Sequence, residues 1–298
     1  MSVLTGDPPV DSSGAEVFVL PASYAQQRLW FLDQLDPESP LYGMPFALRL
    51  RGPLETCALT WALGEIVRRH ETLRTTLTVE DGEAVQVIAP PADTWELPKV
   101  DLGRIAPELR WSEALRLTAA EAARPFDLES GPLFRTVLYR LGEDDHLLSL
   151  NLHHAIADGW SLGVLGRDLA ALYGAPEPLP ELPIQYADFA AWQRGQLAEV
   201  EAEQLAWWRE RLRGAPEVLE LPLARPRPAV RDHRGGHAVL VLPAELNDRV
   251  KAFCRQEGVT RFLALLTAFE ILLRRTTGQS DLVIGTPLAG RELVETEG

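Results

Sequence analysis

The sequence predicts a mixed α/β protein built from two lobes. Its 298 residues are too many for one average domain and suit two lobes of about 150 residues each. Segments with helical periodicity alternate with segments whose apolar residues alternate between two faces. A proline-rich stretch at residues 174–183, with four prolines in ten residues, marks the link between the lobes. We therefore expect a leader at 1–16, a first lobe at 17–176 and a second at 177–298.

In the first lobe, helices are expected where apolar residues recur every three or four positions, and strands where they alternate. Asp81-Gly82 is the strongest hairpin signal, because tight hairpin turns need residues that tolerate positive φ. Ser23 is a plausible helix cap. In chain order the patterns predict a helix from Ser23, a strand at 46–53, a helix ending near His70, a hairpin at 73–79 and 84–88, a helix at 112–123 and strands at 133–141 and 146–153.

The second lobe is expected to begin with a long helix at 187–212. Trp192, Trp207 and Trp208 recur on it at helical spacing and are interpreted as packing aromatics. Later segments predict a strand at 238–242, helices at 244–257 and 260–274 and a strand at 282–285.

Composition excludes several classes of function. A net charge of −14 argues against a nucleic-acid partner, since binding phosphates needs clustered Lys and Arg. Cys57 and Cys254 are the only cysteines and lie far apart, so no zinc site is expected. No signal peptide and no run of about 18 apolar residues is present. We expect a cytoplasmic protein with no membrane or metal partner.

The sequence His153-His154-Ala155-Ile156-Ala157-Asp158-Gly159 is the main candidate for chemistry. Strand alternation places His153 and His154 on opposite faces at the end of a strand, and a helix is expected over 161–173. The end of a strand that leads into a helix is a common place for ligands in α/β layers.

An imidazole there can exchange a proton near neutral pH, because its unperturbed pKa is about 6.5. Asp158 could orient an imidazole or an arginine, or could hold the loop closed. Gly159 would let a substrate or a backbone approach closely. The residue types alone leave two interpretations open: a catalytic site, or two hydrogen-bonded histidines near a capping aspartate.

A wider pattern extends this motif, and it resembles the condensation domains of nonribosomal peptide synthetases. Five stretches follow the family's order: Ser23–Leu32, Arg69–Thr75, His153–Ser161, Tyr186–Gln193 and Ile284–Arg291. The resemblance implies two lobes, each like chloramphenicol acetyltransferase, set in a V around a tunnel. It also implies amide bond formation between a donor acyl, aminoacyl or peptidyl thioester and the amine of an acceptor aminoacyl thioester, in secondary metabolism such as antibiotic biosynthesis.

The implied partners are donor and acceptor peptidyl carrier proteins and a neighbouring adenylation domain. Both substrates would arrive on the phosphopantetheine arms of the carriers, and the domain itself would bind no cofactor. Retention of His153 and His154 sets the chain apart from heterocyclisation domains, which carry aspartates there. The motifs most resemble the type that joins two L-configured units.

The resemblance also assigns roles to residues. His154 would be catalytic, with His153, Asp158, Gly159 and Arg291 as structural residues of the motif. Asp158 and Arg291 are expected to form a direct, buried ion pair. A further set would be structural or line the tunnel: Arg28, Arg74 and Trp160. His70 is expected to be a buried, hydrogen-bonded histidine.

The sequence ends at Gly298, ahead of the family's next motif. We therefore expect a complete N-terminal lobe, a partial C-terminal lobe and weak or absent activity from the chain alone. Two other functions stay open: a non-catalytic docking module for carrier proteins, and a stand-alone acyltransferase that uses CoA esters.

Overall fold

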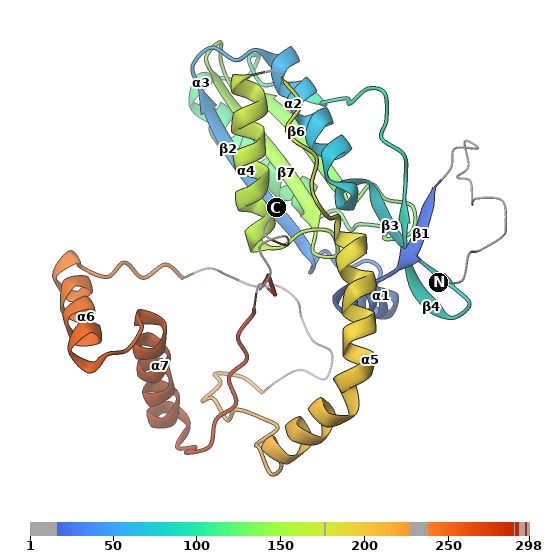
Figure 1. Ribbon diagram of the computed structural model, residues 1–298. Coiled ribbons are helices and arrows are strands. Elements are labelled where there is room, and N and C mark those ends of the chain that lie inside the picture. The colour runs from blue at the N-terminus through green and yellow to red at the C-terminus, as the bar shows by residue number, and fades with distance from the viewer. Residues whose placement is uncertain are drawn as a thin grey trace. The chain divides into compact units, whose positions relative to one another are not determined.

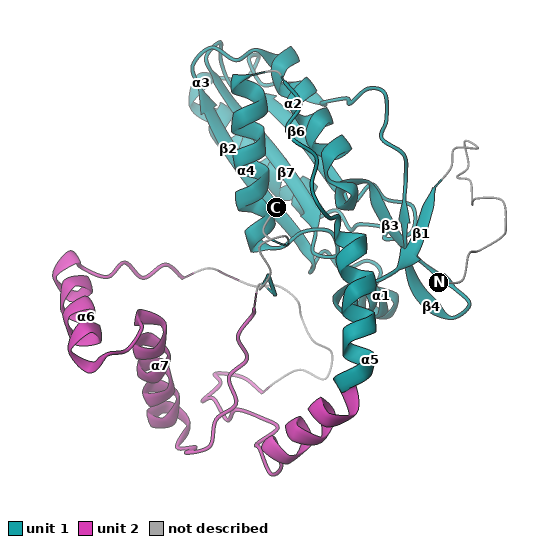
Figure 2. Cartoon of the chain, in the orientation of Figure 1, with its two compact units in different colours: residues 1–200, 289–298 teal, residues 201–288 magenta. Residues whose placement is uncertain are grey.

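The computed structural model describes residues 17–175, 177–226, 236, 238–288, 290–291 and 296. The chain divides into two compact units, Met1–Val200 with Ala289–Gly298 and Glu201–Leu288 (Figure 2). Within the described residues, the first unit holds both β-sheets and the second is helical. The predicted mixed α/β class is confirmed. The predicted lobe boundary at 176/177 stays a prediction.

A four-stranded sheet forms the centre of the first unit (Figure 1). Its strands are β2 (Gly43–Arg51), β5 (Lys99–Asp101), β6 (Phe134–Arg140) and β7 (Asp145–His153), in the order β2-β7-β6-β5. β7 pairs antiparallel with both neighbours, and β5 pairs parallel with β6. The predicted strand pair β6–β7 is thus confirmed, and β7 occupies a central position.

Both faces of the sheet are covered by helices, which explains why almost all of β7 is buried. Leu148, Leu150 and Leu152 lie in a core shared with α2 (Thr56–Arg69) and α4 (Gly159–Gly174). Leu147 lies in a second, smaller core with Ala114 of α3 (Pro107–Ala122). Alternate side chains of one strand therefore fill two different cores, as strand geometry requires.

A second sheet of three strands contains β1 (Phe18–Pro21), β3 (Thr75–Glu80) and β4 (Glu83–Ile88), in the order β1-β4-β3. The turn between β3 and β4 has φ of 52° at Asp81 and 83° at Gly82. Two consecutive positive φ values are the signature of the type I′ turn that matches strand twist. The predicted hairpin is confirmed.

The remaining helices of the first unit follow their local signals. α1 (Tyr24–Leu35) begins with a capping box in which Ser23 and Gln26 each accept a backbone N–H of the other. A short 3₁₀ helix, η1 (Glu71–Arg74), follows α2. α3 starts five residues before the predicted Ser112, because Pro107 suits the first helical turn, where its missing N–H costs nothing.

The second unit contains α6 (Ala244–Glu257) and α7 (Arg261–Thr277), joined by a turn at Gly258 with φ of 66°. Both helices were predicted. The strands predicted at 238–242 and 282–285 are wrong: neither segment forms a strand. A strand needs a neighbouring backbone for its N–H and C=O groups, and none pairs with these segments in the described chain. Val239, Leu240 and Val241 are 80–87% exposed.

The long helix α5 (Tyr186–Arg211) was predicted, but the packing role of its tryptophans was not confirmed. Trp192, Trp207 and Trp208 each expose about half of their surface. Trp207 and Trp208 contact each other edge to face, with ring centroids 4.8 Å apart. Adjacent helical residues point in directions about 100° apart, so both rings cannot face one core. None of the described helices is long and apolar enough to cross a membrane.

Candidate active site

The two histidines of the motif lie where β7 leaves the sheet. The backbone N–H of His153 donates to the Leu133 carbonyl at 3.0 Å, and that of His154 donates to the Tyr42 carbonyl at 2.8 Å. Leu133 and Tyr42 directly precede β6 and β2, the two neighbours of β7. The backbone of the two histidines is therefore hydrogen-bonded to the segments that lead into both neighbouring strands of β7.

His153 is the last residue of β7, and its side chain is buried. Only 5% of its surface is exposed, and its Nδ1 accepts the Ala155 N–H at 3.0 Å. The rings of Tyr42 and Phe126 contact its imidazole edge to face. Burial, with a smaller effect from the charge of His154, lowers the pKa of His153 to about 4. His153 is thus neutral at pH 7 and uses its ring nitrogen to close the turn.

His154 has the opposite environment. Its side chain is exposed, although the residues on both sides, His153 and Ala155, are buried. The difference follows from position, because His153 is the last residue of β7, whereas His154 begins the turn that leads out of the covered sheet. Of the two imidazoles, that of His154 is the one that a substrate can reach.

Asp158 caps α4, the helix that follows the motif. Its Oδ1 accepts the Ser161 N–H at 2.8 Å and the Ser161 hydroxyl at 2.6 Å. The Ser161 Oγ in turn accepts the Asp158 N–H at 3.1 Å, which completes a capping box. The carboxylate therefore neutralises the positive end of the α4 dipole.

Arg291 binds the same cap. Its Nη2 lies 3.3 Å from Asp158 Oδ1 and donates to Ser161 Oγ at 3.0 Å. Burial raises the pKa of Asp158, but hydrogen bonds from Ser161 and the charge of Arg291 outweigh it and hold that pKa below its ordinary value. The predicted direct ion pair is confirmed. The prediction that it is buried was wrong, since the side chains of Arg291 and Asp158 are 19% and 37% exposed.

The other predicted residues lie in different surroundings. Arg28 is exposed on α1. Arg74 donates to the Ala89 carbonyl and to Glu71 Oε1, contacts that hold η1 against the end of β4. Trp160 is 44% exposed at the start of α4. At Gly159, a Cβ atom would meet no described atom within 4 Å, so space stays open there.

We find no group of three or more His, Cys, Asp or Glu side chains that could hold a metal within the described ranges. The family model described as Condensation domain matches residues 18–297. This chain belongs to the condensation domain family. The order of the five motifs and the model match agree over nearly the whole sequence.

Curated relatives of this condensation domain are peptide synthetases. The chain is 50% identical over 285 residues to a linear gramicidin synthase polypeptide of Brevibacillus parabrevis, a match that covers 94% of this chain and 6% of that protein. It is 49% identical over 284 residues to phosphinothricin tripeptide synthetase PhsC of Streptomyces viridochromogenes, covering 93% and 26%. The chain thus spans a small part of each relative.

Solved condensation-domain structures share the fold. The X-domain from teicoplanin biosynthesis matches with a TM-score of 0.81 and 32% identity, over 93% of this chain and 62% of that chain. The first condensation domain of the calcium-dependent antibiotic synthetase, solved with a substrate analogue, matches with a TM-score of 0.76 and 25% identity, over 94% and 66%.

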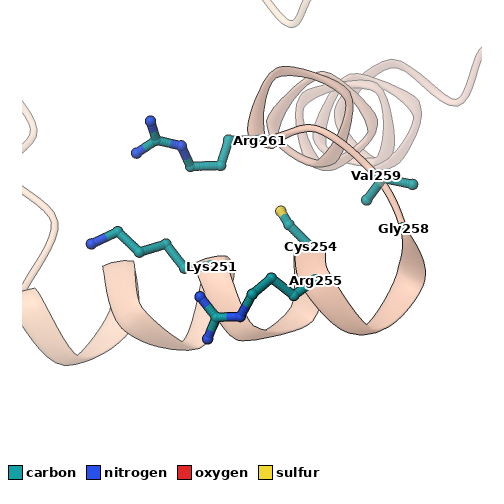
Figure 3. Close-up of a pocket in the computed structure, with 6 residues that line it drawn as sticks. All are labelled: Lys251, Cys254, Arg255, Gly258, Val259 and Arg261. Atoms are coloured by element: carbon teal, nitrogen blue, oxygen red, sulfur yellow. The ribbon is translucent and has the colours of Figure 1, made fainter.

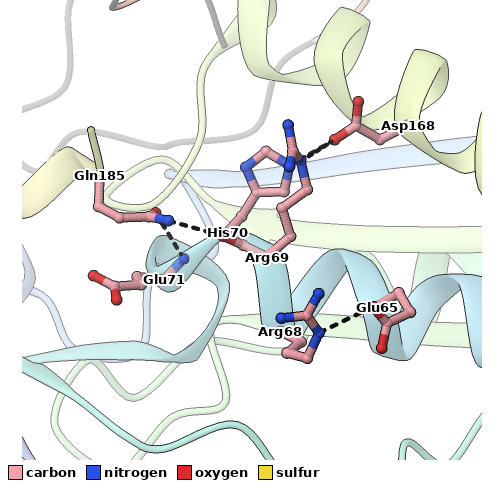
Figure 4. Close-up of polar contacts among 7 residues, drawn as sticks. All are labelled: Glu65, Arg68, Arg69, His70, Glu71, Asp168 and Gln185. Atoms are coloured by element: carbon pink, nitrogen blue, oxygen red, sulfur yellow. Dashed lines mark hydrogen bonds and ion pairs between the residues drawn. The ribbon is translucent and has the colours of Figure 1, made fainter. Parts of the chain in front are cut away.

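The second motif of this condensation domain forms a polar cluster between helices (Figure 4). Asp168 of α4 accepts from Arg69 Nε at 3.2 Å and pairs with His70 Nε2 at 2.8 Å. The side chain of Gln185, just before α5, accepts the Glu71 N–H at 3.2 Å and donates to the Arg69 carbonyl at 2.9 Å. The cluster joins the end of α2 to α4 and to the start of α5.

Burial raises the pKa of Asp168, but the His70 hydrogen bond and the charges of His70 and Arg69 lower it further, so the net shift is downward. His70 is hydrogen-bonded, as predicted, with 15% of its side chain exposed.

Several contacts of motif residues were missed by the sequence reasoning. Gln26 reaches the motif loop and donates to the Ala155 carbonyl at 3.2 Å. Ser23 shares a hydrogen bond with the Tyr186 hydroxyl at 2.8 Å, which joins the first and fourth motifs. The spacing of Ser23 and Gln26 signals their local capping box but not these distant contacts. Asp168 lies among leucines of an apolar helix and has no comparable signal.

A pocket of about 400 Å³ lies in the second unit between α6 and α7 (Figure 3). Its lining is Lys251, Cys254, Arg255, Gly258, Val259 and Arg261. No motif residue contributes to it.

Proposed function

We propose that this chain takes part in amide bond formation in a nonribosomal peptide synthetase. The donor is an acyl, aminoacyl or peptidyl thioester, and the acceptor is the amine of an aminoacyl thioester. The observation that carries the proposal is the exposed imidazole of His154, held on a fixed backbone beside the buried His153, in a member of the condensation domain family.

For this reaction the protein has to position the two substrates and assist one proton transfer. The acceptor nitrogen attacks the thioester carbonyl, the C–N bond forms, and the C–S bond then breaks to release the donor thiolate. The nitrogen must lose a proton, and the thiolate must gain one. His154 is the group that accepts or steers the first proton, a role that positioned histidines often perform. Holding two substrates in line supplies much of the remaining rate.

The residues around His154 have supporting roles in this proposal. Asp158 is a structural residue that caps α4 and binds Arg291, and it does not take part in proton transfer. The open space at Gly159 lets a substrate oxygen approach the backbone N–H groups at the start of α4. Trp160 and Arg28 line the path of a substrate, whereas Arg74 is structural.

The proposed architecture is that of the family: two lobes like chloramphenicol acetyltransferase, set in a V, with this chain holding the first lobe and part of the second. The partners are the donor and acceptor carrier proteins, which bring phosphopantetheine-bound substrates, and an adenylation domain nearby. A matching four-domain nonribosomal peptide synthetase, solved with AMP and glycine, supports such neighbours, with a TM-score of 0.82 and 26% identity over 93% of this chain.

A second candidate is a docking module without turnover. It is favoured by the likeness to the teicoplanin X-domain, which has also been solved in a complex with OxyB. Under this candidate the fold would serve to bind a partner protein, and His154 would have no effect on function.

The test uses the intact protein that contains this chain, with donor and acceptor carrier proteins loaded with substrates. Formation of the amide is followed by mass spectrometry, for the native protein and for His154→Ala. Amide formation that His154→Ala abolishes is expected. Carrier binding without any amide, unchanged in His154→Ala, would overturn the proposal in favour of the docking module. Turnover of CoA thioesters in place of carrier-bound ones would favour a stand-alone acyltransferase.

A further inference from the structure

The backbone on both sides of His154 is held by a series of hydrogen bonds. The His154 N–H donates to Tyr42, the Ala155 N–H donates to His153 Nδ1, and the Ile156 N–H donates to the His153 carbonyl at 3.0 Å. Each of these bonds uses an atom of the sheet or of the loop itself. The Ala155 carbonyl differs, because its partner is Gln26 of α1, 129 residues away in the sequence.

Gln26 is almost completely buried, with 1% of its surface exposed. Its Oε1 accepts the Ser23 N–H at 2.9 Å, and its Nε2 donates both to the Ala155 carbonyl at 3.2 Å and to Gln86 Oε1 at 3.0 Å. Gln86 of β4 is equally buried, and its own Nε2 donates to the Pro21 carbonyl at 3.0 Å. The oxygen and the nitrogen of each of the two amides therefore have a hydrogen-bond partner.

The orientation of both amides is dictated by the backbone. The Ser23 N–H can only donate, so it requires the oxygen of Gln26. The Ala155 and Pro21 carbonyls can only accept, so they require the nitrogens of Gln26 and Gln86. One arrangement satisfies all three conditions, and a buried amide that breaks any of them leaves a polar group without a partner.

We propose that Gln26 is a positioning residue for His154. Its amide nitrogen fixes the peptide that follows His154, and Gln86 holds that amide in place. The imidazole itself stays exposed, while the direction of its Cα–Cβ bond is set by the buried network. This inference rests on the proposed function, in which His154 is the reacting histidine.

The consequence is that catalysis depends on the amide nitrogen of Gln26. Gln26→Glu keeps the shape of the side chain and an acceptor for the Ser23 N–H, but its carboxylate faces the Ala155 carbonyl with no proton to donate. A small displacement of a reacting group can cost on the order of 100-fold in rate. We expect Gln26→Glu to lower kcat by about 10- to 100-fold, with a smaller effect on the KM for either carrier protein.

Gln86→Glu is the matched control. It places a carboxylate in the same buried pair, yet it leaves the bond from Gln26 Nε2 to Ala155 intact. Both variants are therefore expected to lower Tm, and only Gln26→Glu is expected to lose most of kcat. Gln34→Glu, exposed on the same helix, controls for added charge on α1.

The experiment measures amide formation and Tm for the three variants of the intact protein. It also records the imidazole nitrogen signals of His154 by NMR, assigned with His154→Gln. A displaced or broadened His154 signal in Gln26→Glu, absent in Gln86→Glu, supports the proposal. Equal loss of kcat in the two variants at equal Tm, or an unchanged His154 signal, would overturn it. If the native protein forms no amide, the proposed function fails, and the NMR comparison still decides the positioning role.

Discussion

Arg291 and Asp158 are separated by 133 residues in the sequence, and the Nη2 of one lies 3.3 Å from the Oδ1 of the other. The same carboxylate oxygen accepts the Ser161 N–H. Asp158 therefore has two structural functions, as the cap of α4 and as the partner of a distant arginine. The capping function connects it to the local fold, and the ion pair connects residue 291 to that cap.

Removal of Asp158 should affect stability as much as chemistry. We expect Asp158→Ala to lower the free energy of unfolding by about 1–2 kcal/mol, the usual cost of losing a helix cap. Arg291→Met leaves the cap itself intact and removes the partly exposed ion pair and the hydrogen bonds of Arg291 to Ser161 and Thr296, so it should cost less, about 1 kcal/mol. Urea unfolding at pH 7 measures both. A well-folded Asp158→Ala protein with native stability would contradict this account of the cap.

His153 should make stability depend on pH. Its pKa of about 4 in the folded protein lies below its ordinary value, so the unfolded chain binds the proton more tightly. Stability from this group is complete above about pH 6.5 and is lost as the pH falls toward 4, by about 3 kcal/mol in total.

Urea unfolding at pH 7, 5.5 and 4.5 tests this expectation, with His153→Gln as the variant that should lose most of the dependence. His146 also has a pKa lowered mainly by burial, which acts in the same direction. His146→Gln therefore separates the two contributions. A native protein equally stable at pH 7 and 4.5 would refute the burial of a neutral His153.

His154→Ala should separate chemistry from stability. Because the side chain is exposed, the free energy of unfolding should change by less than about 0.5 kcal/mol. The rate of amide formation should fall by about 10²- to 10⁴-fold if this imidazole transfers the proton. Single-turnover assays with loaded carriers and thermal unfolding of the same preparation provide the two numbers. A large fall in Tm would show that the side chain has a packing role.

Asp168→Ala should destabilise the first unit, because it removes the acceptor of Arg69 and His70, whose side chains are 15% exposed. Leaving largely buried donors without a partner costs about 1–3 kcal/mol. The lowered pKa of Asp168 means that its contribution is present above about pH 4 and is lost as the pH falls through the folded-state value. Glu210→Ala, which breaks an exposed ion pair with Arg213 at the end of α5, is the control and should change stability little. Equal unfolding curves for the two variants would contradict the role of the cluster.

Much of the first unit could be predicted from its sequence because its signals are local. The Asp81-Gly82 turn, the caps at Ser23 and Asp158 and the two faces of β7 each depend on residues within a few positions. The predicted strands at 238–242 and 282–285 failed for the opposite reason. Apolar alternation favours a strand only when another strand supplies its hydrogen bonds, and that partner is not encoded in the segment itself.

The site was predictable to the same degree. The motif pointed to the His153-His154 pair, and the family resemblance pointed to His154 and to the Asp158–Arg291 pair. The contacts of Gln26 with Gln86 and Ala155 span 60 and 129 residues, and that of His70 with Asp168 spans 98. A single sequence contains no periodic pattern that would indicate contacts between positions so far apart. Their importance follows only when burial shows that each polar atom needs a particular partner.

The different surroundings of the two histidines also set a condition on β7 itself. β2 and β7 are paired with Gly43 opposite His153, and the leucines of β7 keep that register because they fill the core. Deleting one residue between Leu148 and Leu152 would draw His154 into the buried position and leave Ala155 in the exposed one. Such a sequence would still contain the motif, but the imidazole of His154 would no longer be exposed to a substrate. In relatives, an even or odd number of residues in this strand therefore decides which histidine is exposed. That number is as informative about the site as the presence of the two histidines.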